Sequence, residues 1–105
     1  MISKLSDSKT WIAREHDRPA GMVIQLLKRT LVLPWSQFLY ADGDDERISV
    51  EFATHGISIC GSGLSCLLTE LGAQRVSLLR EPVRADRFSS DPGPRITSIL
   101  IQKMG

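Results

Sequence analysis

The apolar residues change from even to odd positions in the middle of the chain, and this switch constrains the fold more than any other feature. Positions 48, 50 and 52 hold isoleucine, valine and phenylalanine, whereas isoleucines follow at 57 and 59. Because side chains alternate between the two faces of a strand, a two-residue turn at His55 and Gly56 would keep all five on one face. That register places Phe52 opposite Ile59. The turn is plausible because both turn residues tolerate positive φ, glycine most readily.

A helix is expected directly after this hairpin, at about Gly63 to Leu71. Leucines at 64, 67, 68 and 71 have the spacing of one helical face. Ser62 is placed to cap the first turn, and Gly72 to end the helix in a left-handed conformation. Since each buried leucine contributes about 1.5 to 3 kcal/mol, we expect the leucines and the apolar face of the hairpin to form the core.

Most of the remaining chain has the pattern of strands. The segments with this pattern are Trp11 to Arg14, the alternating run from Leu31 to Tyr40, Val76 to Leu79, and Ile96 to Ile101. The last segment is apolar on both faces at its end, as is typical of a central strand. Met22 to Lys28 fits both a helix and a strand, and its assignment stays open.

These elements predict an α+β fold in which one main helix packs on an antiparallel or mixed sheet of about five strands. The strand order is left open. A length of 105 residues fits a single domain. We place that domain at residues 21–105, and the polar composition of residues 1–20 indicates a flexible N-terminal arm.

Composition argues against several classes of protein. The formal net charge is only +1, which does not indicate a strongly basic surface. Two cysteines are too few for a disulfide framework, and the N-terminus lacks the apolar run of a signal peptide. No segment approaches the roughly 18 apolar residues of a membrane span. We therefore expect a soluble, cytoplasmic protein with free thiols and no membrane contact.

The turn Gly61-Ser62-Gly63 is a weak candidate for an anion site. It follows a predicted strand and opens a predicted helix, where free backbone N–H groups and the helix dipole can hold a phosphate. However, the dinucleotide-binding motif requires a third glycine where this chain has Cys66, and a parallel βαβ unit. An ordinary turn between strand and helix is the better interpretation.

Three residues invite a metal or catalytic interpretation, namely His55, Cys60 and Cys66. The spacing of the cysteines is wider than in zinc hairpins, and no fourth ligand is evident. Cys66 lies near a helix N-terminus, where a thiol pKa can fall, but cysteine is more often a small core residue. We therefore expect no metal, no cofactor and no catalytic residues, and the sequence favours a non-enzymatic role.

A cluster of arginines suggests nucleic-acid binding as an alternative. Arg75, Arg80, Arg84 and Arg87 lie close together in the sequence, yet acidic residues at 81 and 86 interrupt them. Nucleic-acid-binding domains usually have a stronger basic stripe. This cluster and the Gly61 turn therefore form only the second hypothesis.

The first hypothesis is a domain that binds a protein partner or a second copy of itself. Residues 31–60 carry one basic and five acidic groups, whereas residues 1–30 carry six basic and three acidic groups. Trp35, Phe38 and Tyr40 lie next to the acidic turn at Asp42 to Glu46, and aromatic residues beside charges suit a contact surface. The sequence identifies neither the partner nor the oligomeric state.

Overall fold

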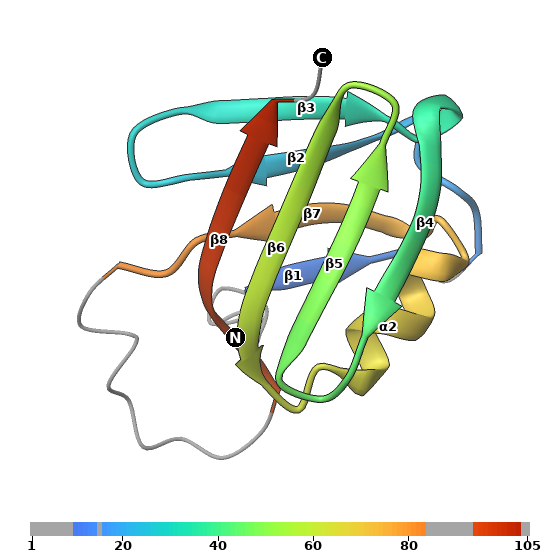
Figure 1. Cartoon of the computed structure of the whole chain (residues 1–105). Coiled ribbons are helices and arrows are strands. Elements are labelled where there is room, and N and C mark those ends of the chain that lie inside the picture. Colours follow the sequence, from blue (N-terminus) through green and yellow to red (C-terminus); the bar gives the residue numbers. More distant parts are fainter. Residues whose placement is uncertain (1–9, 15, 84–93, 104–105) are drawn as a thin grey trace, which may run out of the picture.

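The computed structural model describes residues 10–14, 16–83 and 94–103, which form two four-stranded sheets and one α-helix (Figure 1). The strands are β1 (Trp11–Ala13), β2 (Gly21–Gln25), β3 (Thr30–Pro34), β4 (Phe38–Gly43), β5 (Arg47–Phe52), β6 (His55–Ser62), β7 (Val76–Arg80) and β8 (Arg95–Lys103). A short 3-10 helix, η1 (Trp35–Gln37), joins β3 to β4, and α2 (Ser65–Gly72) joins β6 to β7. The mixed sheet has the order β1-β7-β2-β3, and the antiparallel sheet has the order β4-β5-β6-β8.

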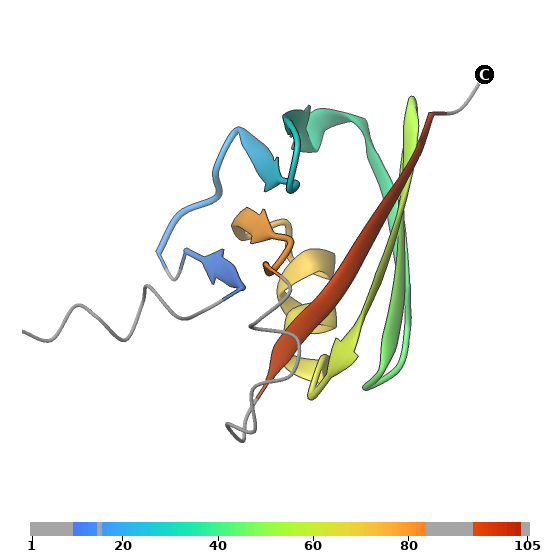
Figure 2. The same ribbon diagram turned by 90° about the vertical axis from the view of Figure 1, so that its left-hand side faces the viewer.

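The α+β class is confirmed, with one α-helix packed against the antiparallel sheet, but the strands form two sheets rather than a single sheet of about five. The sheets pack face to face with α2 at one end between them, and the strands of one run across those of the other (Figures 1 and 2). The sequence predicts one alternating strand segment from Leu31 to Tyr40. Pro34 and η1 break it at a corner, so that β3 and β4 belong to different sheets.

The core lies between the two sheets and includes the inner face of α2. Its sixteen buried members are Met22, Ile24, Leu33, Trp35, Ile48, Val50, Phe52, Ile57, Ile59, Leu64, Leu67, Leu71, Val76, Leu79, Ile96 and Ile99. At the corner, the rings of Trp35, Phe38 and Phe52 pack with centroids 5.2 to 5.7 Å apart. Of the aromatic residues predicted near a contact surface, Trp35 is therefore a core residue, Phe38 is partly buried against the core, and Tyr40 is 55% exposed.

The β5–β6 hairpin exists, but its turn lies two residues earlier than predicted. Ile48 pairs with Ile59 and Val50 pairs with Ile57, so the chain turns at residues 53–54 and His55 already belongs to β6. The predicted register placed Phe52 opposite Ile59 and was wrong. Both registers keep the apolar side chains on one face, because they differ by an even number of residues. The observed one pairs isoleucine with isoleucine and valine with isoleucine across the strands.

The helix begins and ends later than predicted, and its ends are stabilised differently. The N-cap residue is Leu64, whose side chain makes no hydrogen bond to the first turn. The left-handed residue after the helix is Gln74, with φ 59°, and not Gly72. Leu64, Leu67 and Leu71 are fully buried, while Leu68 is half-buried against the core. Within the described residues, no helix is long and apolar enough to cross a membrane.

The segment from Met22 to Lys28, which the sequence left open, is strand up to Gln25, as part of β2, and continues into the β2–β3 turn. Residues 1–9 of the expected N-terminal arm lie outside the described residues, whereas β1 is an edge strand whose Trp11 packs against the core. The interpretation of Ile96 to Ile101 as a central strand was wrong, because β8 is the last strand of the antiparallel sheet. Its apolar outer residue Leu100 is 62% exposed.

Candidate functional site

At the Gly61-Ser62-Gly63 turn, the chain's own carboxylate stands where the sequence suggested an anion. The Asp45 side chain accepts hydrogen bonds from the N–H of Gly63 at 3.2 Å, and from the N–H and hydroxyl of Ser65 at 3.2 and 2.9 Å. These bonds, those from Ser65 foremost, hold the pKa of the Asp45 carboxyl below its ordinary value of 3.8. The turn therefore fastens the β4–β5 loop to the start of α2.

Each of the two positions favours glycine for a different physical reason. Gly63 has φ 66°, a conformation that glycine adopts without strain. Gly61 lies at a bulge against β8, where a Cβ atom would overlap the carbonyl oxygen of Arg95. Ser62 is exposed at the end of β6 and does not cap the helix. Sequence reasoning found the glycines but missed Asp45, which acts from 20 residues away.

The neighbouring residue Asp44 closes the β4–β5 turn. Its Oδ1 accepts hydrogen bonds from the N–H groups of Glu46 at 2.9 Å and Arg47 at 3.0 Å. These two bonds, the one from Glu46 first, lower the pKa of the Asp44 carboxyl. Two carboxylates of the acidic turn are therefore engaged in the structure of the turn itself.

The predicted arginine cluster is not one patch in the described residues. Arg75 precedes β7 and pairs with Glu70 at 3.0 Å, while Arg80 ends β7 and donates to Gln25 at 3.3 Å. Arg80 lies five positions after Arg75, which along a strand corresponds to about 16 Å. Arg84 and Arg87 lie outside the described residues.

The structure does not bring the candidate metal residues together. His55 begins β6, with Nδ1 2.8 Å from the Thr54 hydroxyl, while Cys60 lies five residues further along the same strand. Cys60 pairs with Arg47 on the outer face of the sheet, and Cys66 is exposed on α2. In the described part of the chain, no three histidine, cysteine or acidic residues are grouped as metal ligands.

The feature that sequence reasoning missed is a row of aliphatic side chains on the outer face of the mixed sheet. Ile12 pairs with Leu78, Leu78 with Val23, and Val23 with Val32, so the row crosses all four strands in register. Ile12 and Val32 are 41% and 58% exposed, and the middle two are half-buried. We call these four residues the aliphatic row.

A sequence signal for the row was available. Residues 22–24 and 31–33 are apolar at consecutive positions, which places apolar side chains on both faces of β2 and β3. Their inner residues Met22, Ile24 and Leu33 are in the core, and their outer residues face away from it. The same pattern at Ile96 to Ile101 predicts a central strand, so a consecutive apolar run alone does not indicate an open face.

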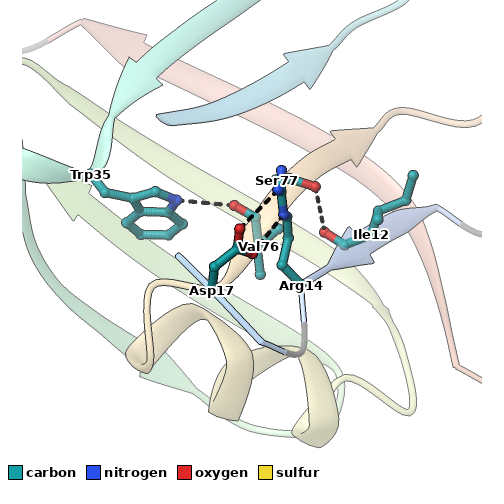
Figure 3. Close-up of polar contacts among 6 residues, drawn as sticks. All are labelled: Ile12, Arg14, Asp17, Trp35, Val76 and Ser77. Atoms are coloured by element: carbon teal, nitrogen blue, oxygen red, sulfur yellow. Dashed lines mark hydrogen bonds and ion pairs between the residues drawn. The ribbon is translucent and has the colours of Figure 1, made fainter. Parts of the chain in front are cut away.

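Figure 3 shows polar contacts that join β7 to its neighbours, together with an ion pair that follows β1. On the inner side, the Trp35 indole donates to the carbonyl of Val76 at 3.0 Å and ties the corner to β7. On the β1 side, the Ser77 hydroxyl donates to the carbonyl of Ile12 at 3.3 Å, where the β1–β7 register shifts. Arg14 binds Asp17 through two hydrogen bonds of 2.9 and 3.0 Å. Strand β7, which carries Leu78 of the row, is therefore joined by side-chain hydrogen bonds to the corner at Trp35 and to β1.

No family model, curated protein or solved structure matches this chain, so its own geometry carries the functional argument.

Proposed function

We propose that this chain is a non-enzymatic protein-binding domain and that the aliphatic row is the centre of its contact surface. The observation that carries the proposal is the alignment of four aliphatic residues on the outside of a sheet, the outer two exposed and the middle two half-buried. Solvent-facing sides of sheets normally carry polar residues. Contiguous apolar patches on a surface commonly mark contacts with other proteins.

The other sheet of the same molecule supports this interpretation by contrast. The outer face of the antiparallel sheet carries mainly polar and small residues, among them Ser49, Ser58 and Ser98. Its exposed leucines, Leu39 and Leu100, lie apart on the two edge strands β4 and β8 and form no row. The mixed sheet also contains the parallel pair β2–β7, and parallel strands are usually covered on both faces. No helix or strand of the described residues covers the outer face of this pair (Figure 2).

The charges around the row favour a partner with an acidic rim. Lys28 and Arg29 lie in the β2–β3 turn, and no acidic side chain of the described residues pairs with them. A partner that presents aliphatic side chains flanked by carboxylates would complement this surface.

The test places a photoreactive amino acid at Val32 and activates it in the cells that make the protein. The matched control carries the same group at Leu39, which is 62% exposed on β4 of the other sheet. We expect a cross-linked protein from position 32 and none from position 39. Equal cross-linking from both positions, or none from position 32, would refute the proposal.

A titration then measures the contact directly. The cross-linked protein is purified and its affinity is compared for the wild type, Val32→Asp and Leu39→Asp. Since residues at the centre of an interface carry most of the binding energy, Val32→Asp should weaken binding at least about tenfold. Leu39→Asp should leave the affinity unchanged.

A further inference from the structure

β8 presents a long strand edge that no other strand of the described residues pairs with. It pairs with β6 and is the last strand in the order β4-β5-β6-β8. Its other edge faces the viewer in Figure 2. Edge strands expose backbone donors and acceptors that can pair with a further strand.

The hydrogen bonds of the sheet identify which backbone groups of β8 point outward. The N–H of Gly61 donates to the carbonyl of Glu46 at 3.0 Å, so the odd-numbered residues of β6 bond to β5 and the even-numbered ones to β8. Ser58 and its partner Leu100 therefore bond to each other. The N–H and C=O groups of the alternate residues Ile99 and Ile101 therefore point away from β6, toward the open edge of the sheet.

The open part of the edge begins after a bulge. Between Cys60 and Gly61 the register with β8 shifts, and the N–H of Ile96 donates to the Thr10 hydroxyl at 2.9 Å. That donor is therefore already satisfied by the chain. The remaining edge runs from Thr97 to Lys103.

Beyond the bulge near Thr97, the edge of β8 lacks the features that protect the other three edge strands. β1 has three residues, β3 ends in a proline, and β4 contains a bulge and carries Asp42. Residues 96–102 of β8 contain neither a charge nor a proline, and they include four β-branched residues. Short length, proline, bulges and charges are the usual protection against strand pairing.

We propose that β8 pairs antiparallel with β8 of a second copy of this chain, about a two-fold axis that places Leu100 opposite Leu100. In such a pair, hydrogen bonds join residues whose backbone groups both face outward. Centring the axis on Ile99 or on Leu100 satisfies that condition. The first choice pairs Arg95 with Lys103, two like charges, whereas the second pairs Lys103 with Thr97.

The register centred on Leu100 also accounts for the exposure of that side chain. Its two copies would form a non-hydrogen-bonded pair, where Cα atoms lie about 4.5 Å apart and side chains are closest. Ile99 would pair with Ile101, so the contact continues the apolar inner face of each sheet. A second copy fits better than a foreign strand because this edge complements itself in that register, with each Lys103 opposite Thr97 and no like charges paired.

The expected product is a dimer with a continuous eight-stranded sheet. A contact limited to two strands is smaller than a standard protein interface, so the dimer should form in a concentration-dependent way. This pairing uses a different sheet from the aliphatic row, and it does not depend on the proposed protein-binding function.

The first experiment measures the molar mass by sedimentation over a wide concentration range. The wild type and Leu39→Asp should dimerise, whereas Leu100→Asp, which places two carboxylates opposite each other, should raise the dissociation constant at least about tenfold. Both leucines are 62% exposed, so the two variants are matched, and circular dichroism verifies their folds. A monomeric wild type, or a dimer that Leu100→Asp leaves unchanged, would overturn the proposal.

The second experiment tests the register and does not require Leu100→Asp to fold. In a background with Cys60→Ser and Cys66→Ser, Leu100→Cys should form an intermolecular disulfide under mild oxidation, because the two Cα atoms would lie within bridging distance. Ser98→Cys is the control, since it would face Gln102 of the partner. Equal cross-linking of the two variants would exclude this register.

Discussion

Asp45 in the β4–β5 turn and Ser65 at the start of α2 are joined by two hydrogen bonds to a single carboxylate oxygen, 2.9 Å from the serine hydroxyl and 3.2 Å from its N–H. The backbone adds a third link, because the N–H of Leu64 donates to the carbonyl of Asp45 at 2.9 Å. A negative charge at a helix N-terminus is favourable, and here it comes from a distant loop. The contact therefore sets the position of the helix relative to the antiparallel sheet.

The first prediction concerns the pH dependence of stability. Because its pKa is lower in the folded protein, the Asp45 carboxylate stabilises the fold fully above the ordinary value of 3.8, and this contribution is lost as the pH falls through the folded pKa. Asp45→Asn should be less stable than the wild type near neutral pH, and the difference should shrink below about pH 4. Urea unfolding at a series of pH values measures both.

The control for this variant is Ser62→Ala. Ser62 lies in the same turn, but its exposed side chain does not cap the helix. The replacement should therefore leave unchanged both the free energy of unfolding near neutral pH and its decrease at acid pH. A loss of stability from Ser62→Ala equal to that from Asp45→Asn would show that serine capping, as first expected from the sequence, operates after all.

The second prediction distinguishes two glycines. Gly63→Ala should destabilise by at least about 1 kcal/mol, since its φ of 66° disfavours any side chain and a Cβ atom would lie 3.0 Å from the Cα of Pro94. Gly56→Ala should be tolerated, because a Cβ there would meet only the end of the flexible Glu51 side chain, at 3.3 Å. Thermal unfolding of both variants decides between this structure and the turn predicted from the sequence at Gly56.

The third prediction concerns the leucines of α2. Leu67 is fully buried, so Leu67→Ala should destabilise by about 2 to 5 kcal/mol. Leu68 is half-buried at the margin of the core, and Leu68→Ala should cost about 1 kcal/mol. Denaturant unfolding measures both. Equal losses would mean that the helix is rotated relative to the structure described above.

The comparison of sequence and structure shows where local patterns suffice. The alternation in β5 and β6 predicted both strands and their buried face, because a strand's period of two does not depend on the rest of the fold. It could not place the turn, since registers that differ by an even number of residues bury the same side chains. Likewise, the leucine spacing predicted the helix but not Asp45, whose contact depends on tertiary structure.

The division into two sheets and the candidate surface were beyond the same patterns. A consecutive apolar run has the same sequence signature whether its second face is buried by the chain or left open. β2 and β8 both have such runs, and the structure leaves outer side chains of both strands partly or largely exposed. Only the strand order and the register reveal that Ile12, Leu78, Val23 and Val32 form one row.

The last prediction concerns nucleic acid, the alternative function suggested by the arginines. Arg75 is paired with Glu70, and about 16 Å of strand separates it from Arg80, so the described part of the cluster can neutralise few phosphates at once. We expect weak binding to mixed-sequence DNA and RNA and no binding at about 150 mM salt. Log affinity should fall against log salt concentration with a slope of magnitude about 2 or less. Fluorescence anisotropy at several salt concentrations measures all three. Sub-micromolar affinity at physiological salt that Arg80→Ala and Arg84→Ala both weaken would instead establish nucleic-acid binding, with Arg75→Ala as the control for a residue already held in an ion pair.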